Sequence, residues 1–220
     1  MNGPKILTKA QLAFLELFGE QPFSQKFYLS GGTALTEFYI PYRLSEDLDF
    51  FSEQEVQIDE VIAFITSIKL KLGFKGFDYN TSFNRNLFFL HFPDYDLKLE
   101  FTYYPFTQIN TLKKEYGIQI DSIEDIAVNK LFTIYQTPRS RDFMDLYMII
   151  QKYKYTIKDL IKKSKVKFDF HVDAIKLGTQ FLLAKELKDY PKLIEPLNEK
   201  EWQDFFLEEA KKLKKEIINS

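Results

Sequence analysis

The chain of 220 residues contains no cysteine and only two histidines, His91 and His171. The absence of cysteine excludes disulfide bonds, thiol nucleophiles and cysteine-based zinc sites. A pair of histidines also disfavours a histidine-rich metal site and most catalytic triads. Any catalysis by this chain therefore has to depend on carboxylates, lysines, arginines and hydroxyl groups.

The sequence also lacks long apolar runs and any marked excess of charge. No apolar run approaches the ~18 residues of a membrane-spanning helix, and residues 1–5 lack the apolar core of a signal peptide. We therefore expect a cytoplasmic protein with no membrane partner. The 30 Lys and Arg residues and 32 Asp and Glu residues leave a net charge of −2. Nucleic acid could be held only by a local basic patch.

The pattern of apolar residues predicts a chain with two different halves. The first half alternates helices and strands, with helices over residues 8–18, 33–39 and 56–72 and strands over residues 26–30, 47–51, 86–92 and 96–103. From Ser122 onward the pattern is helical to the end. We expect an α/β (α+β) fold with an α/β core over residues 1–115 and a helical domain over residues 116–220.

The acidic strand Asp47-Leu48-Asp49 is the first candidate site. Residues i and i+2 of a strand share a face, so both carboxylates point the same way while Leu48 enters the core. A cation would relieve the repulsion between the two carboxylates, and Mg²⁺ prefers such hard oxygen ligands. Glu100, from a neighbouring strand, could be the third ligand, with Asp96 as the alternative. A solvated strand edge would have the same short motif.

A glycine turn, Gly31-Gly32-Thr33, joins the preceding strand to a helix start. Glycines let main-chain N–H groups approach a ligand closely, and a helix N-terminus favours an anion. Thr33 could cap the helix or offer its hydroxyl to a phosphate. Arg43, just before the acidic strand, could contact phosphate or pair with Glu46. A tight corner without a ligand is the simpler interpretation of the turn alone.

Two runs together resemble the signature of the AbiEii/AbiGii-type nucleotidyltransferases, which belong to the DNA polymerase β-like superfamily. These runs are Leu29-Ser30-Gly31-Gly32-Thr33-Ala34-Leu35 and Arg43-Leu44-Ser45-Glu46-Asp47-Leu48-Asp49-Phe50. The resemblance implies a polymerase β-like core with a mixed sheet. It also implies that the glycine turn holds a nucleoside triphosphate and that Asp47, Asp49 and a third strand carboxylate bind Mg²⁺. Thr33 stands where Ser is common in this family, and Glu100 where Asp is common.

Lys130 and Asp145 are the candidates from the helical half. Lys130 lies on an apolar stripe with Ile126 and Ile134, so it either extends along the helix edge to solvent or points inward at phosphates. The run from Arg139 to Tyr147 resembles the family motif R-x-x-D-x-x-D-L-Y, in which an aspartate completes the catalytic group. Asp145 is our choice, as a base or as the residue that orients Lys130. Ser45, Arg141 and Asp142 complete the nucleotide-binding residues that the resemblance implies.

The resemblance further implies a bacterial toxin that transfers a nucleotide to RNA, with a tRNA end as one candidate, and that is neutralised by an antitoxin protein. Seven lysines between Lys152 and Lys167 form the best basic stretch for an RNA backbone. A solvated helix face is the default interpretation of such a run. A small-molecule acceptor and a non-catalytic nucleotide-binding module remain the alternatives.

Overall fold

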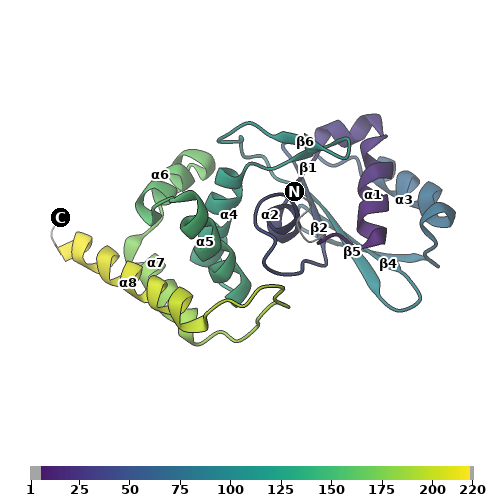
Figure 1. The fold of residues 1–220 in the computed structure, drawn as a ribbon. Helices are drawn as coiled ribbons and strands as arrows, with labels where there is room; N and C mark the ends of the chain where they lie inside the picture. The colour runs from purple at the N-terminus through teal and green to yellow at the C-terminus, as the bar shows by residue number, and fades with distance from the viewer. Residues whose placement is uncertain (1–5, 219–220) are drawn as a thin grey trace. The chain divides into compact units, whose positions relative to one another are not determined.

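The computed structural model describes residues 6–218. Residues 1–5, on which the expectation about a signal peptide rests, and residues 219–220 lie outside the described residues. The chain divides into two compact units between Ser122 and Ile123 (Figure 1). The observed boundary lies seven residues after the predicted one at residue 115. The reason is that β6 and β7, within residues 113–120, belong to the sheet of the first unit.

The first unit is built on one mixed sheet of seven strands in the order β3-β4-β5-β2-β1-β7-β6. The central strand β2 pairs parallel with β5 and antiparallel with β1, and β1 pairs parallel with β7. Its elements are α1 (Lys9–Gly19), η1 (Pro22–Lys26), β1 (Tyr28–Ser30), α2 (Gly31–Phe38), β2 (Leu48–Ser52), α3 (Ile58–Leu72), β3 (Phe77–Ser82), β4 (Arg85–His91), β5 (Asp96–Tyr103), β6 (Lys113–Glu115) and β7 (Ile118–Ile120).

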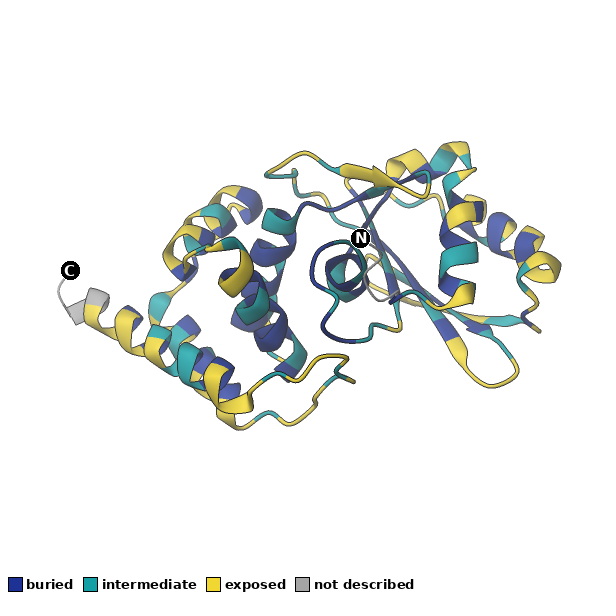
Figure 2. Cartoon of the chain, in the orientation of Figure 1, coloured by how far each residue is buried: buried dark blue, intermediate teal, exposed yellow. Residues whose placement is uncertain are grey.

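One face of this sheet carries the apolar core of the first unit. Leu48 and Phe50 are buried on it, as the alternation in the sequence predicts. The ring of Phe50 stacks on Phe101 of β5 at 4.9 Å, and Phe18 of α1 packs on Phe50 at 4.8 Å. Phe64 of α3 contributes to the same cluster, so α1 and α3 cover this face (Figures 1 and 2). The carboxylates of the neighbouring positions are left on the opposite face.

Local signals in the sequence set several of these boundaries. The predicted capping box is confirmed, because Thr8 accepts from the main chain of Gln11 while the Gln11 side chain accepts from Thr8. Helix α2 begins at Gly31, two residues before the predicted start, since the positive φ of 71° at Gly31 turns the chain directly from β1 into the helix. Strands β3, β6 and β7 were not predicted.

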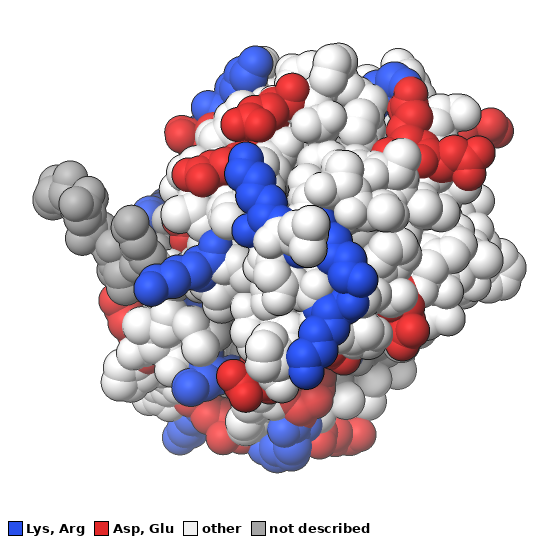
Figure 3. All heavy atoms as spheres, turned by 90° about the vertical axis from the view of Figure 1, so that its right-hand side faces the viewer, with Lys and Arg blue, Asp and Glu red and all other residues white. Residues whose placement is uncertain are grey.

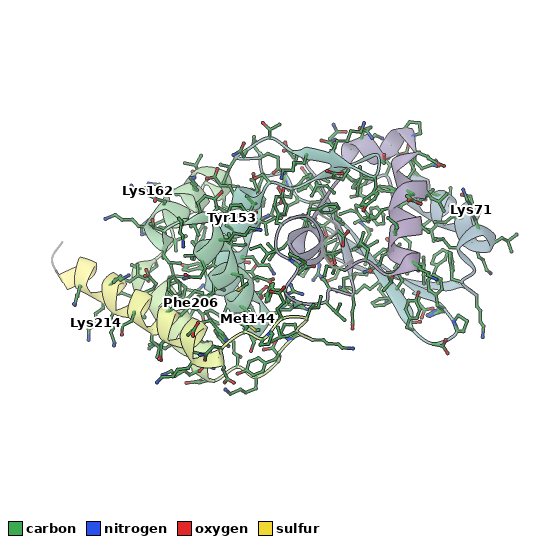
Figure 4. The ribbon with its side chains drawn as sticks, viewed as in Figure 1. Lys71, Met144, Tyr153, Lys162, Phe206 and Lys214 are labelled. Carbon is green, nitrogen blue, oxygen red and sulfur yellow. The ribbon has the colours of Figure 1, made fainter. Side chains whose placement is uncertain are left out.

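The second unit is all helical, as predicted. Its elements are α4 (Ile123–Gln136), α5 (Ser140–Tyr153), α6 (Ile157–Phe168), α7 (Ala174–Leu182), η2 (Leu183–Lys185) and α8 (Glu199–Ile218). The buried ring of Phe206 on α8 (labelled in Figure 4) lies 4.8 Å from Phe143 and 5.2 Å from Phe181, so one aromatic cluster joins α5, α7 and α8. No helix within residues 6–218 is long and apolar enough to cross a membrane.

Candidate active site

The glycine turn is closed over by three polar side chains. A Cβ atom added at Gly31 would lie 2.6 Å from Oδ2 of Asp49, and one at Gly32 would lie 2.5 Å from Nη2 of Arg43 and 2.9 Å from Oγ of Ser45. Gly31 also has a φ of 71°, which L side chains rarely adopt. Glycine is therefore favoured at Gly31 by the main-chain conformation, whereas a side chain at Gly32 would have to displace the ends of Arg43 and Ser45 from the start of α2.

Arg43 and Thr33 are both buried at this turn. The guanidinium of Arg43 donates to the carbonyl of Leu44 at 2.9 Å, and the side chain lies beside the main chain of Gly32. The buried hydroxyl of Thr33 donates to the main-chain carbonyl of Asp47. Thr33 therefore connects α2 to the start of β2, a role that differs from both expectations for this residue.

The strand register brings Glu100 beside Asp49. In the parallel pairing of β2 with β5, Asp49 lies opposite Glu100, whereas Asp96 lies four residues away at the start of β5. Asp96 contacts Nδ1 of His91 through Oδ1 at 2.8 Å. Between the two alternatives for a third carboxylate, the register therefore favours Glu100.

Basic side chains neutralise two of these carboxylates. Nζ of Lys98 lies 2.7 Å from Oδ2 of Asp47 and 3.8 Å from Oε2 of Glu100. Arg85 binds Glu100 with two hydrogen bonds, from Nε to Oε1 at 2.7 Å and from Nη2 to Oε2 at 2.6 Å. Burial is the largest single effect and would raise the pKa of Glu100. The hydrogen bonds and charge of Arg85, together with the Thr102 hydroxyl and the charge of Lys98, outweigh burial, so the pKa of Glu100 is lowered. Glu100 is therefore held as an anion.

The oxygen donors of this face fit a magnesium ion. Mg²⁺ is usually held by one or two carboxylates together with substrate phosphates and water, and Asp47 and Asp49 supply such a pair. Within residues 6–218, no group of three or more His, Asp or Glu side chains is placed to hold a metal ion. Glu100 could join the pair as a ligand only if Arg85 released at least one of its oxygens.

Lys130 in the helical unit lies between two aspartates of α5. Its Nζ is 2.7 Å from Oδ1 of Asp142 and 2.7 Å from Oδ2 of Asp145. The Lys130 side chain is 11% exposed, and those of Asp142 and Asp145 are 1% and 0% exposed. The interpretation that Lys130 extends to solvent is therefore wrong. Of the two roles considered for Asp145, its contact with Lys130 favours orientation of the lysine. Arg141, on the same helix, is half-buried.

Part of the predicted basic stretch has a structural role. Lys167 forms an ion pair with Asp125 at 2.6 Å, and both side chains are fully buried. Lys163 pairs with Glu124, so these two lysines fasten α6 to the first turn of α4. Lys167 is therefore unsuitable as a phosphate contact, and the Lys163 ammonium group already has a carboxylate partner. The exposed lysines of the run are Lys152, Lys154, Lys158, Lys162 (labelled in Figure 4) and Lys165.

Charged side chains of both signs share the face drawn in Figure 3, which agrees with the nearly balanced composition.

The sequence analysis missed Arg85 and Lys98 as members of the carboxylate cluster. The alternation of Asp96, Lys98 and Glu100 along one strand could have indicated Lys98. Arg85 has no such signal, because its contact with Glu100 depends on the pairing of β4 with β5.

Comparisons with known proteins agree with these features. Residues 13–217 match the family described as "Nucleotidyl transferase AbiEii toxin, Type IV TA system". An uncharacterised protein from Aquifex aeolicus (strain VF5) is 31% identical over 211 residues, which cover 93% of this chain and 96% of that protein.

Two solved structures from Helicobacter pylori share the fold. JHP933 superposes with a TM-score of 0.61 at 21% identity, over 98% of this chain and 96% of JHP933. A second protein, which carries the provisional name of a nucleotidyltransferase, gives a TM-score of 0.60 at 22% identity, over 97% of this chain and 98% of that protein. The expected nucleotidyltransferase fold is confirmed by this likeness.

Proposed function

Because the chain belongs to the AbiEii family of nucleotidyl transferase toxins, as its motifs predict, we propose that it transfers the nucleotidyl group of a nucleoside triphosphate to a hydroxyl group of an RNA acceptor. The acceptor hydroxyl releases its proton to solvent and its oxygen forms a bond to the α-phosphorus. The bond between the α-phosphorus and the oxygen that bridges it to the β-phosphate breaks, and pyrophosphate leaves with that oxygen. The chain is a nucleotidyltransferase by family and fold; the RNA acceptor and the use of Mg²⁺ are the new parts of this proposal.

The observation that carries the proposal is the glycine turn with its three polar neighbours. Gly31 and Gly32 open the N-terminal end of α2, where main-chain N–H groups favour phosphate oxygens. Arg43 and Ser45, both in contact range of Gly32, supply a cation and a hydroxyl at the same point. We assign the triphosphate to this turn, with Thr33 as the residue that holds the turn against β2.

Asp47 and Asp49 are the proposed magnesium ligands, with Glu100 as the third once Arg85 has moved. A bound Mg²⁺ would polarise the reacting phosphate and stabilise the charge that develops on the leaving pyrophosphate. Lys98 neutralises Asp47 at 2.7 Å when the metal is absent. The role of Lys98 is then to balance the charge of the carboxylates and to position them before the metal and nucleotide bind.

The helical unit is proposed to contribute a cation to the same reaction. Asp142 and Asp145 both contact the Nζ of Lys130, so they balance the lysine in its buried place. Its role is to balance the negative charge of the nucleotide phosphates, and Asp145 positions it. We place Arg141 and Asp142 among the nucleotide-binding residues, with Asp142 acting through Lys130.

An RNA acceptor needs positive charge along its backbone, and the exposed lysines of α5 and α6 are the proposed contacts. If Lys158, Lys162 and Lys165 each contact one phosphate, replacing all three by Gln should flatten the log–log salt dependence of RNA binding by about 2, at ~0.7 per contact for single strands. The Gln variant should still bind Mg²⁺ and nucleotide as the wild type does.

We further propose, from the family, that a cognate antitoxin protein neutralises this toxin in the cell.

The test is transfer of label from each α-labelled nucleoside triphosphate to total cellular RNA in the presence of magnesium. We expect labelled RNA with the wild type and none with Asp47→Asn or Asp49→Asn. Asp94→Asn is the matched control, because Asp94 is an exposed carboxylate in the turn before β5. Near-normal transfer by Asp49→Asn would refute the metal assignment, and label found only on small molecules would refute the RNA acceptor.

A further inference from the structure

The hairpin between β3 and β4 ends in an unusual residue. Ser82 pairs with Arg85, so Phe83 and Asn84 form a two-residue turn. Phe83 is fully exposed, at 102% of its reference area, and its φ is 52°, in the left-handed region. A positive φ at the first position of such a turn is normally supplied by glycine, and a bulky residue there is strained.

Phe83 therefore combines a strained main-chain conformation with a fully exposed apolar ring, and no contact with the other described residues of the unit offsets either. No ring contact, hydrogen bond or ion pair of Phe83 occurs among residues 6–218. Tyr116 has a similar φ of 50°, but its ring packs against Phe38 at 6.0 Å. Leu70, which is 95% exposed, lies in α3 with ordinary helical geometry. A strained, exposed aromatic residue is a reason to look for a binding role.

The position of the hairpin connects it to the carboxylate face. Phe83 precedes Arg85, the first residue of β4, by two residues, so the two side chains lie at the same end of the hairpin. The guanidinium of Arg85 reaches Glu100, which lies opposite Asp49 in the sheet. The Arg85 side chain is 51% exposed, and only its Nε and one Nη2 hydrogen are used on Glu100. The remaining guanidinium N–H groups can donate to a phosphate.

We propose that the β3–β4 tip is a binding site for single-stranded RNA, in which Phe83 stacks on an unpaired base and Arg85 contacts an adjacent phosphate. This inference rests on the proposed RNA acceptor and adds a recognition site within the first unit. Stacking explains why a planar side chain stands at a position that geometry assigns to glycine. Every base has a stacking face, so the contact tolerates different sequences.

The test measures binding of a fluorescently labelled, unstructured 12-nucleotide RNA to the full chain by anisotropy. Removing one stacked base contact costs about 1–3 kcal/mol, so Phe83→Ala should weaken RNA binding roughly 5- to 150-fold. Phe83→Trp should retain the affinity. Phe83→Gly should weaken binding as much as Phe83→Ala does, but melt no lower than the wild type because glycine relieves the strained φ. Leu70→Ala, the matched exposed apolar control, should bind RNA normally.

Binding of magnesium and nucleoside triphosphate, measured by calorimetry, should be unchanged in all four variants. If Phe83→Ala binds RNA as tightly as Leu70→Ala, the stacking role is wrong. The same conclusion follows if Phe83→Gly melts clearly below the wild type, since Phe83 would then have a structural role. If the wild type itself binds no RNA but transfers nucleotide to a small molecule, the proposed acceptor is wrong, and the inference is overturned for that separate reason.

Discussion

Replacing Lys130 by Met tests whether the buried lysine is an electrostatic centre of the helical unit. Met keeps most of the apolar stem, so the main change is the loss of a charge. Asp142 and Asp145, whose side chains are 1% and 0% exposed, would then lose this buried cation, although Asp142 keeps its longer ion pair with Arg139 at 3.4 Å. Removal of one partner from a buried ion pair costs about 3–5 kcal/mol. At ~4 °C or more per kcal/mol for a domain of about 100 residues, the melting temperature should fall by at least ~12 °C.

The cause of this loss can be separated from the loss of packing. The triple variant Lys130→Met, Asp142→Asn, Asp145→Asn removes both buried carboxylate charges together with the lysine, so we expect most of the lost stability to return. Nucleotidyl transfer should remain absent in both variants, since neither has the cation that balances the phosphates.

The assays are thermal unfolding followed by circular dichroism and transfer of label from the nucleoside triphosphate. A Lys130→Met protein that melts within 2 °C of the wild type would contradict the magnitude derived from burial. If the triple variant melts no higher than Lys130→Met, the loss of stability is caused by lost packing of the lysine side chain and not by the buried carboxylate charges. A stable triple variant with normal transfer would show that Lys130 has no part in the reaction.

Three further results are expected. Gly32→Ala should weaken binding of the nucleoside triphosphate in calorimetry, because its Cβ would displace the guanidinium of Arg43 and the hydroxyl of Ser45 from the turn; wild-type affinity would contradict a role for these two groups. Arg85→Met should lower the free energy of unfolding at pH 7, because Arg85 lowers the pKa of Glu100 in the folded protein and so stabilises it. Measured by urea unfolding, the difference in this free energy between variant and wild type should shrink below about pH 4.5, as Glu100 is protonated. A difference that does not change with pH would rule out this linkage. Lys167→Met should lower the free energy of unfolding by about 3–5 kcal/mol, because Asp125 would lose the buried cation that contacts it. A loss below about 1 kcal/mol would be inconsistent with a buried pair.

The sequence predicted those parts of the site that depend on local geometry. The period of a strand places Asp49 opposite in direction to Leu48 and Phe50, and the two glycines indicate a turn before a helix. Each of these features needs only the residues within one element and its immediate neighbours, so the printed sequence contains the whole signal.

Features that depend on pairing between distant segments could not be predicted. The binding of Arg85 to Glu100 requires the register of β4 on β5, and the pairing of Lys167 with Asp125 requires α6 to pack on α4. The run of seven lysines showed no sign that two of them are bound internally. Strand β3 was missed because most of its side chains are exposed and lack the alternation that marks a half-buried strand.

The pairing of β1 with β7 has a consequence for synthesis of the chain on the ribosome. The hydroxyl of Ser30, directly before the glycine turn, donates to Asp121 at 2.6 Å across 91 residues of sequence. Contacts of such separation form late, since a long loop has to close before they contribute. A nascent chain therefore cannot complete the strand that supports the nucleotide turn until β7 has emerged. The catalytic sheet should remain unfinished until more than half of the protein has been translated.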